Sequence, residues 1–170
     1  SLLESYYRLH TLLKSMTPEK RDTALDKLEN ELCPSVKNRS DYRSMTSSEL
    51  LAFSRSRCVT IGGHTVTHTR LSNESNGKQK WEIEESKKQV EKYLSKPIET
   101  FSYPFGNRDD YTQQTIEILK KVGYRKAASN YPGIWDPSID GMEIPRNLIR
   151  NWSVKEFARN LNKIWDYYGA

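Results

Sequence analysis

The second half of the chain alternates short β-prone runs with amphipathic stretches of helical length, and this pattern restricts the fold more than any other feature. In the amphipathic stretches, apolar residues recur at three- and four-residue spacing, which is typical of helices with one buried face. Strands that alternate with such helices form βαβ units around a parallel sheet. The predicted strands span residues 58–61, 98–102, 124–128 and 142–149, and the predicted helices span 79–94, 110–122 and 153–167. The sequence therefore predicts an α/β fold.

A pair of helices is predicted ahead of this α/β region. Apolar residues between Leu2 and Met16 recur at helical spacing. Thr17 then provides an N-cap, and Pro18 a first-turn residue, for a second helix that ends near Leu32. We expect the two helices to run antiparallel.

The domain boundary is predicted close to a polar loop over residues 38–43. A capping box that begins at Thr46 then opens a short helix over residues 47–54. We therefore divide the chain into an N-terminal helical segment, residues 1–41, and an α/β domain, residues 42–170.

Composition and charge exclude several classes of protein. Aromatic residues make up 11% of the 170 residues, which is typical of a folded chain. The net charge of +5 comes from basic residues interleaved with acidic ones, as on solvated helix faces, so we expect no nucleic-acid partner. No apolar run approaches the roughly 18 residues of a membrane span, and the first residues do not resemble a signal peptide. Cys33 and Cys58 lack the spacing of a disulfide framework or a zinc site, and the compartment stays open.

Two of the three histidines follow the first predicted strand, in the segment Gly-Gly-His-Thr-Val-Thr-His over residues 62–68. Paired glycines let the backbone approach a neighbour closely. Imidazoles four residues apart meet on one side of a helical turn, and two nitrogen donors are half of a tetrahedral zinc site. His64 and His68 are therefore candidate metal ligands. By spacing alone, two surface histidines at the start of a helix are the more frequent outcome.

Residues 101–106, Phe-Ser-Tyr-Pro-Phe-Gly, form a second candidate segment. Aromatic residues here surround a Pro-Gly break at the carboxyl end of a predicted strand, where α/β domains place their binding loops. A turn plugged by aromatic side chains is the alternative, and the sequence does not separate the two.

Arg146 is a third candidate, because it lies among apolar residues of the last predicted strand. A charged side chain in such a strand must be paired or must face a polar cleft. The alternative is an edge-strand arginine that reaches solvent along its aliphatic stem.

Together these segments resemble the second and third sequence motifs of the polysaccharide deacetylases of carbohydrate esterase family 4, the NodB homology domain. The two matching segments are Gly62–Leu71 and Phe101–Gly106, and the resemblance covers about residues 42–160. Other residues also match the spacing of this group: Met45, Thr46, Glu49, Leu50, Glu82, Glu84, Lys87, Glu91, Gly123–Ala127 and Ile144–Arg146. The resemblance implies a deformed or partial (β/α) barrel, preceded here by the helical pair.

The resemblance also implies metal-dependent hydrolysis of N-acetyl groups on the amino sugars of a polysaccharide or its precursor. His64 and His68 would be two imidazole ligands of a divalent metal, most often Zn²⁺, and Thr65 would contact the bound ligand beside them. Such a metal lowers the pKa of bound water and polarises the amide carbonyl.

On the same resemblance, the backbone N–H of Phe105 would help to form an oxyanion hole, where a donor faces the developing negative charge. Tyr103 and Pro104 would line the substrate groove. Trp135 is a further candidate for sugar stacking, although aromatic residues of this kind more often pack in a core or at its rim.

The chain departs from the family pattern at three positions. The Asp-Asp pair of the first motif, which supplies the catalytic base and the third metal ligand, has no match. The aspartates ahead of the histidine segment lie on predicted helices or in the polar loop: Asp22, Asp26 and Asp41. The arginine of the third motif is Ser102 here, and Arg146 is the candidate to take over its charge. The late catalytic histidine has no counterpart, because the only other histidine is His10.

The missing first motif allows two interpretations. The chain does not begin with Met, so we favour a deacetylase whose opening strand and Asp pair lie upstream of these residues. The alternative is a catalytically incomplete family member that acts as a glycan-binding or structural domain. In both cases an open sheet edge must be covered by the helical pair or by a second copy of the chain.

Overall fold

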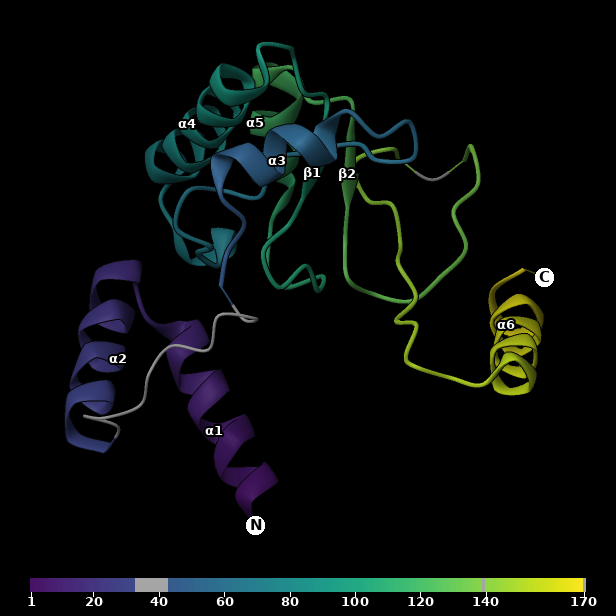
Figure 1. Ribbon diagram of the computed structural model, residues 1–170, viewed down its shortest axis with the longest axis horizontal. Coiled ribbons are helices and arrows are strands. Elements are labelled where there is room, and N and C mark those ends of the chain that lie inside the picture. Colours follow the sequence, from purple (N-terminus) through teal and green to yellow (C-terminus); the bar gives the residue numbers. More distant parts are fainter. Residues whose placement is uncertain (33–42, 139, 170) are drawn as a thin grey trace.

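The computed structural model describes residues 1–32, 43–138 and 140–169 (Figure 1). Its helices are α1 (Leu2–Ser15), α2 (Pro18–Leu32), α3 (Ser47–Ser54), a 3-10 turn (Leu71–Asn73), α4 (Asn76–Leu94), α5 (Gln113–Val122) and α6 (Val154–Tyr168), and its strands are β1 (Thr100–Ser102) and β2 (Lys126–Ala128). The predicted α/β organisation is confirmed. The predicted domain boundary lies outside the described residues, as do Cys33 and Asp41.

The sheet is built from chain segments that lie side by side in sequence order. β1 and β2 pair in parallel, with Phe101 opposite Ala127. Two isolated parallel bridges extend this pair of strands into a row of four segments. Gly63 pairs with Phe101 beside β1, and Ile144 pairs with Ala128 beside β2. This order is expected for consecutive βαβ units, and it brings the carboxyl ends of the segments to one edge of the sheet.

The strands predicted at residues 58–61 and 142–149 are wrong: residues 58–61 form no bridge, the nearest one being at Gly63, and residues 142–149 contribute only the bridge at Ile144. Pro145 has no N–H and interrupts the ladder directly after Ile144. At the other edge, Val59 donates to the carbonyl of Ser56 in a turn instead of pairing with a neighbouring strand. The β-prone composition of both regions was a local signal, whereas a strand also requires a partner over its length.

Helix boundaries differ from the predicted ones where a different residue provides the cap. α4 begins three residues earlier than predicted, because the Ser75 hydroxyl accepts from the backbone N–H of Lys78. α5 begins three residues later than predicted, because Thr112 is its N-cap and Asp110 lies outside the helix. The capping box predicted at Thr46 is confirmed.

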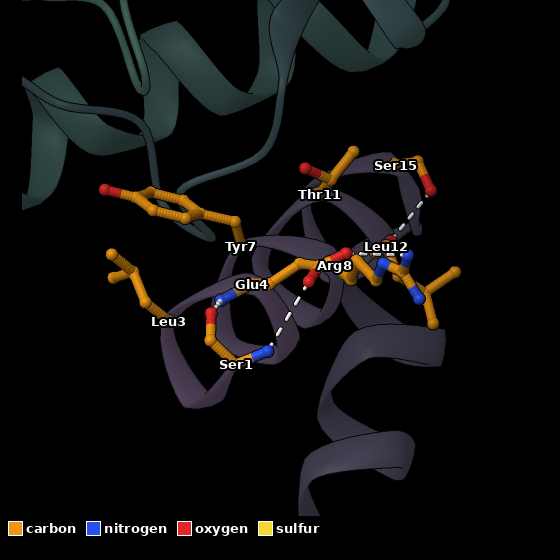
Figure 2. A pocket seen from close by; sticks show the side chains of 8 residues that line it. All are labelled: Ser1, Leu3, Glu4, Tyr7, Arg8, Thr11, Leu12 and Ser15. Atoms are coloured by element: carbon orange, nitrogen blue, oxygen red, sulfur yellow. Dashed lines mark hydrogen bonds and ion pairs between the residues drawn. The ribbon is translucent and has the colours of Figure 1, made fainter.

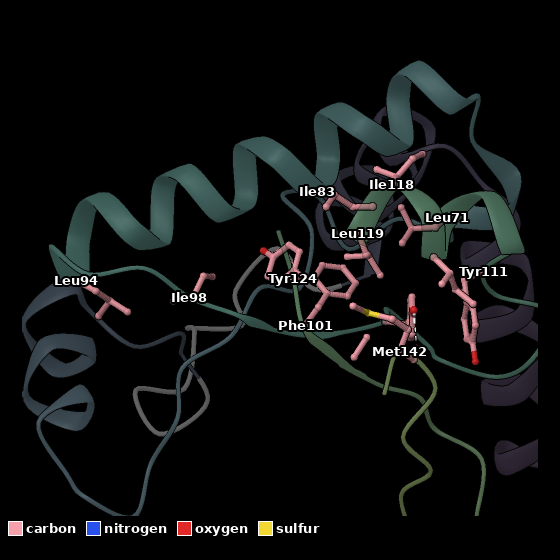
Figure 3. Packing of buried hydrophobic residues seen from close by; sticks show 13 residues of the cluster. Leu71, Ile83, Leu94, Ile98, Phe101, Tyr111, Ile118, Leu119, Tyr124 and Met142 are labelled. Atoms are coloured by element: carbon pink, nitrogen blue, oxygen red, sulfur yellow. Dashed lines mark hydrogen bonds between the residues drawn. The ribbon is translucent and has the colours of Figure 1, made fainter. Parts of the chain in front are cut away.

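The hydrophobic core lies between the sheet and the helices α4 and α5. Figure 3 shows Ile83 of α4 and Leu119 of α5 near Phe101 and Tyr124. Ile83 and Leu119 are fully buried, and the rings of Phe101 and Tyr124 meet at 5.2 Å between centroids. This packing fixes β1, and with it the loop that follows β1.

We expect Gly63→Ala to destabilise the fold. A Cβ atom at Gly63 would overlap the Tyr124 hydroxyl and would lie 3.2 Å from the Phe101 ring. Tyr124 is buried and cannot move aside, so overpacking should cost about 1–3 kcal/mol of the free energy of unfolding. Urea denaturation followed by circular dichroism measures this loss. Gly77→Ala is the matched control, because no atom lies within 4 Å of a Cβ at Gly77. Equal midpoints for Gly63→Ala and wild type would refute the prediction.

The remaining helices lie outside this core. α6 stands apart from α3, α4 and α5 in Figure 1, and none of its residues is buried. α1 contacts the loop that follows β1, through His10 and Lys14, and α2 contacts the histidine loop (residues 64–68), through Arg21. None of the helices in the described part of the chain is long and apolar enough to cross a bilayer.

Candidate metal and substrate site

His64 and His68 meet through a compact loop, and not through the helical turn that their spacing suggested. Thr65 and His68 have positive φ angles of 64° and 53°, and the Thr65 hydroxyl accepts from the backbone N–H of His68 at 3.1 Å. The two imidazole rings lie 4.8 Å apart between centroids. Non-glycine residues in this conformation cost about 1–3 kcal/mol each and concentrate at functional sites, where the surroundings hold them in place.

Glu82 of α4 stabilises this loop through hydrogen bonds. Its side chain is fully buried and accepts from the backbone N–H groups of Val66 and Thr67 at 2.8 and 2.9 Å and from the Thr67 hydroxyl at 2.7 Å. The Lys78 ammonium lies 3.5 Å from the same carboxylate. The buried carboxylate therefore fixes the backbone between the two histidines.

Both imidazoles are in a form that can bind a metal. His64 Nδ1 lies 2.7 Å from the carbonyl oxygen of Ser102, which can only accept, so Nδ1 carries the proton and Nε2 keeps its lone pair. Partial burial of the His68 ring lowers the pKa of His68 below its usual range. His68 is therefore neutral at neutral pH, as a metal ligand must be.

Phe105, in the loop after β1, lies beside the imidazole pair. Its φ angle of 60° is left-handed, and no described residue accepts a hydrogen bond from its N–H. Its ring contacts the His68 ring edge-on, with 4.9 Å between centroids. The N–H of Phe105 is thus available to a ligand beside the imidazole pair.

These groups border one pocket of about 410 Å³. Eight residues line the pocket: His10, His64, His68, Ser102, Tyr103, Phe105, Asn130 and Arg146. The structure therefore brings together five of the residues predicted from the sequence. It adds His10 and Asn130, which lie outside the sequence motifs, and Ser102, which stands at the position of the third-motif arginine.

Arg146 and Tyr103 enter this pocket while bonded to the core. Arg146 Nε donates to the carbonyl oxygen of Ser129, which anchors the guanidinium at the pocket. The Tyr103 hydroxyl donates to the carbonyl of Met142 at 2.8 Å, and its ring stacks on Tyr111 at 3.8 Å. Burial raises the pKa of Tyr103, so its hydroxyl stays neutral. Tyr103 is therefore a fixed part of the pocket wall.

Three predicted site residues are not among the lining residues. The Thr65 hydroxyl accepts a hydrogen bond inside the histidine loop, and Pro104 is fully buried in the turn after β1. Trp135 is 41% exposed and lies away from the pocket lining. Their predicted contact with substrate stays a prediction.

The two imidazoles form an incomplete ligand set by themselves. Within residues 1–32, 43–138 and 140–169, no group of three His, Cys, Asp or Glu side chains is arranged to hold a metal ion. The nitrogen donors nevertheless suit zinc, which takes His, Cys and carboxylate ligands with water in an open position. The donor chemistry of the pair fits such an ion.

Arg21 of α2 also holds the histidine loop, and its removal should weaken metal binding. Its guanidinium donates to the carbonyls of Thr67 at 2.9 Å and His68 at 3.3 Å. We expect Arg21→Ala to lower the zinc affinity roughly fivefold, as for the loss of about 1 kcal/mol of loop stabilisation. Titration calorimetry measures the affinity. Arg8→Ala is the control, because Arg8 pairs only with exposed Glu4. An Arg21→Ala variant that binds zinc like wild type would show that this contact does not support the site.

Known proteins resemble this chain at the level of family and fold. The chain matches the family model for polysaccharide deacetylase over residues 36–127. A search of curated proteins finds no significant match. Among solved structures, the chain is similar to the Streptococcus pyogenes deacetylase PplD in complex with acetate, with a TM-score of 0.63 and 21% identity over 71% of this chain and 52% of that one.

Two further structures show the same fold. One is a Bacillus cereus polysaccharide deacetylase, with a TM-score of 0.58 and 23% identity over 81% of this chain and 46% of that one. The other is the BpsB deacetylase domain of Bordetella bronchiseptica, with a TM-score of 0.55 and 17% identity over 70% of this chain and 54% of that one. The chain thus spans about half the length of these structures, and the predicted partial barrel of the deacetylase type is confirmed. Because the family model matches more than half of its residues, the chain belongs to the polysaccharide deacetylase family.

Proposed function

We propose that this protein is a metal-dependent hydrolase that removes N-acetyl groups from the amino sugars of a polysaccharide or its precursor. The observation that carries the proposal is the approach of the His64 and His68 rings to 4.8 Å in a pocket that Phe105 also lines. Membership of the deacetylase family supports amide hydrolysis as the reaction class. The described solved structure from Streptococcus pyogenes holds acetate, which is the product that such a reaction releases.

The metal, most simply Zn²⁺, would be held by Nε2 of His64 and by the His68 imidazole. When bound, it supplies a Lewis acid that polarises the amide carbonyl and lowers the pKa of water. The carbonyl of Ser102 keeps the His64 ring in the tautomer that this binding requires.

The other pocket residues would act on the substrate directly. The N–H of Phe105 would donate to the carbonyl oxygen as negative charge develops on it, which is the usual task of an oxyanion donor. The Arg146 guanidinium, anchored at the pocket by its bond to Ser129, would add positive charge on the same side. Tyr103, whose hydroxyl is engaged with Met142, would provide a rigid surface for the sugar.

Acetate release tests this proposal. The protein, together with any sequence that lies ahead of residue 1, is incubated with N-acetylated polysaccharides and with N-acetylglucosamine oligomers, with zinc or with a chelator. We expect zinc-dependent release of acetate that a His64→Ala/His68→Ala variant lacks. Binding of the saccharides without release in any condition would overturn the hydrolase and favour a glycan-binding domain.

A further inference from the structure

All three histidines of the chain line the same pocket. His64 and His68 belong to the loop after Gly63, whereas His10 comes from α1, in the N-terminal helical pair. α1 lies outside residues 36–127, over which the chain matches its family. The family match therefore assigns no role to His10.

A buried ion pair fixes α1 at this position. Lys14, one turn after His10, places its ammonium 2.6 Å from Asp110 Oδ1 and 4.8 Å from the centre of the Phe105 ring. The Asp110 side chain is fully buried, and it also bonds Arg70 at 2.8 Å and the backbone N–H of Asn107 at 2.9 Å. Lys14 is thus one of two cations that compensate this buried carboxylate, and a buried charge that loses a partner is strongly destabilised. α1 is therefore a fixed wall of the pocket.

His10 faces the pocket but does not join the imidazole pair as a metal ligand. Its ring meets the Phe105 ring edge-on at 6.1 Å, while His68 meets the same ring at 4.9 Å. No three-ligand group is formed by the residues that the structure describes, His10 included. Between these walls lies about 410 Å³, against roughly 30 Å³ for one water molecule in the liquid. This volume has room for an acetamido group and part of a sugar ring.

We propose that His10 is a substrate-binding residue, which hydrogen-bonds the amino sugar on the α1 side of the pocket. A neutral imidazole offers one donor and one acceptor, so it can bind a sugar hydroxyl or the acetamido group. The inference rests on the proposed function, since it takes the occupant of the pocket to be an N-acetylated sugar. It makes the N-terminal helical pair part of the binding site.

A second hollow on α1 supplies a control residue. This hollow has a volume of about 730 Å³ and is lined by Ser1 and by residues of α1 (Figure 2). Thr11 is one of these lining residues. Thr11 neighbours His10 in sequence but does not line the histidine pocket. Thr11→Ala therefore changes α1 without changing the proposed site.

Calorimetry on the full chain tests the role of His10, with the N-acetylglucosamine tetramer and zinc as separate probes. We expect His10→Ala to weaken tetramer binding about 5- to 10-fold, as for one lost hydrogen bond, and His10→Gln to restore part of it. Thr11→Ala should bind the tetramer like wild type. Zinc affinity should change less than about twofold in His10→Ala, because His10 is not a ligand. His10 is exposed on its helix, so neither variant should unfold the chain.

Each other outcome has a distinct meaning. Tetramer binding by His10→Ala at wild-type affinity would overturn the proposal, and so would a loss of zinc affinity as large as that of His64→Ala. Tetramer binding that depends on His10 without any acetate release would support the His10 site while overturning the hydrolase. A wild-type chain that binds neither probe would overturn both.

Discussion

Replacement of both His64 and His68 by alanine is expected to weaken zinc binding more than about 100-fold. Loss of a residue that merely supports a ligand costs roughly 10- to 100-fold in metal affinity, so loss of both imidazoles should cost more. The two rings are the only histidine pair whose centroids approach to 4.8 Å in the described chain. Titration calorimetry at neutral pH measures the affinity.

The same variant should keep its fold, because both side chains are exposed. Circular dichroism spectra that match wild type would therefore separate loss of the site from loss of structure. Each single variant should show an intermediate affinity, since one nitrogen donor stays in place. Zinc binding by the double variant at wild-type affinity would place the metal elsewhere and contradict the assignment.

Glu82→Ala is expected to destabilise the protein by about 3–5 kcal/mol, the range for removal of one partner from a buried charged network. The substitution removes three hydrogen bonds of 2.7–2.9 Å and leaves the part-buried backbone N–H groups of Val66 and Thr67 without these acceptors. Because these groups lie between the two histidines, zinc affinity should also fall about 10- to 100-fold. Urea denaturation and calorimetry measure the two effects.

Glu84→Ala is the matched control on the same helix. Its carboxylate is half-exposed and meets only Lys80, at 3.6 Å, so its loss should change stability by less than about 0.5 kcal/mol. Glu82→Gln keeps the side-chain volume and one acceptor oxygen, so it should stay folded and still bind zinc weakly. If Glu82→Ala unfolds at the same urea concentration as wild type, the carboxylate does not hold the loop.

The helices were predictable because their signals are local. The apolar spacing over Leu2–Ser15 and the capping boxes at Thr46 and Ser153 gave α1, α3 and α6 nearly as the structure has them. The outer strands were not predictable from composition, because residues 58–61 and 142–149 lack partners along their length. Only the single bridges at Gly63 and Ile144 show where they join the row.

Some residues of the site were also predictable from local sequence, and others were not. His64, His68 and Phe105 stand in sequence motifs, and the structure brings them to one pocket. His10 and Arg21 reach the site only because α1 and α2 dock beside it, and no spacing along the chain reports that docking. The left-handed backbone of Thr65, His68 and Phe105 also had no sequence signal, because none of these residues is glycine or asparagine.

The central claim is that His64 and His68 hold a metal in a pocket built for amide hydrolysis. Anomalous diffraction from crystals of the zinc-loaded protein tests it most directly, because it locates the metal without reference to activity. The account predicts a zinc peak about 2.0–2.1 Å from Nε2 of His64 and from a ring nitrogen of His68, beside the N–H of Phe105. Zinc-loaded crystals with the metal at other residues, or with none at these two imidazoles, would contradict it.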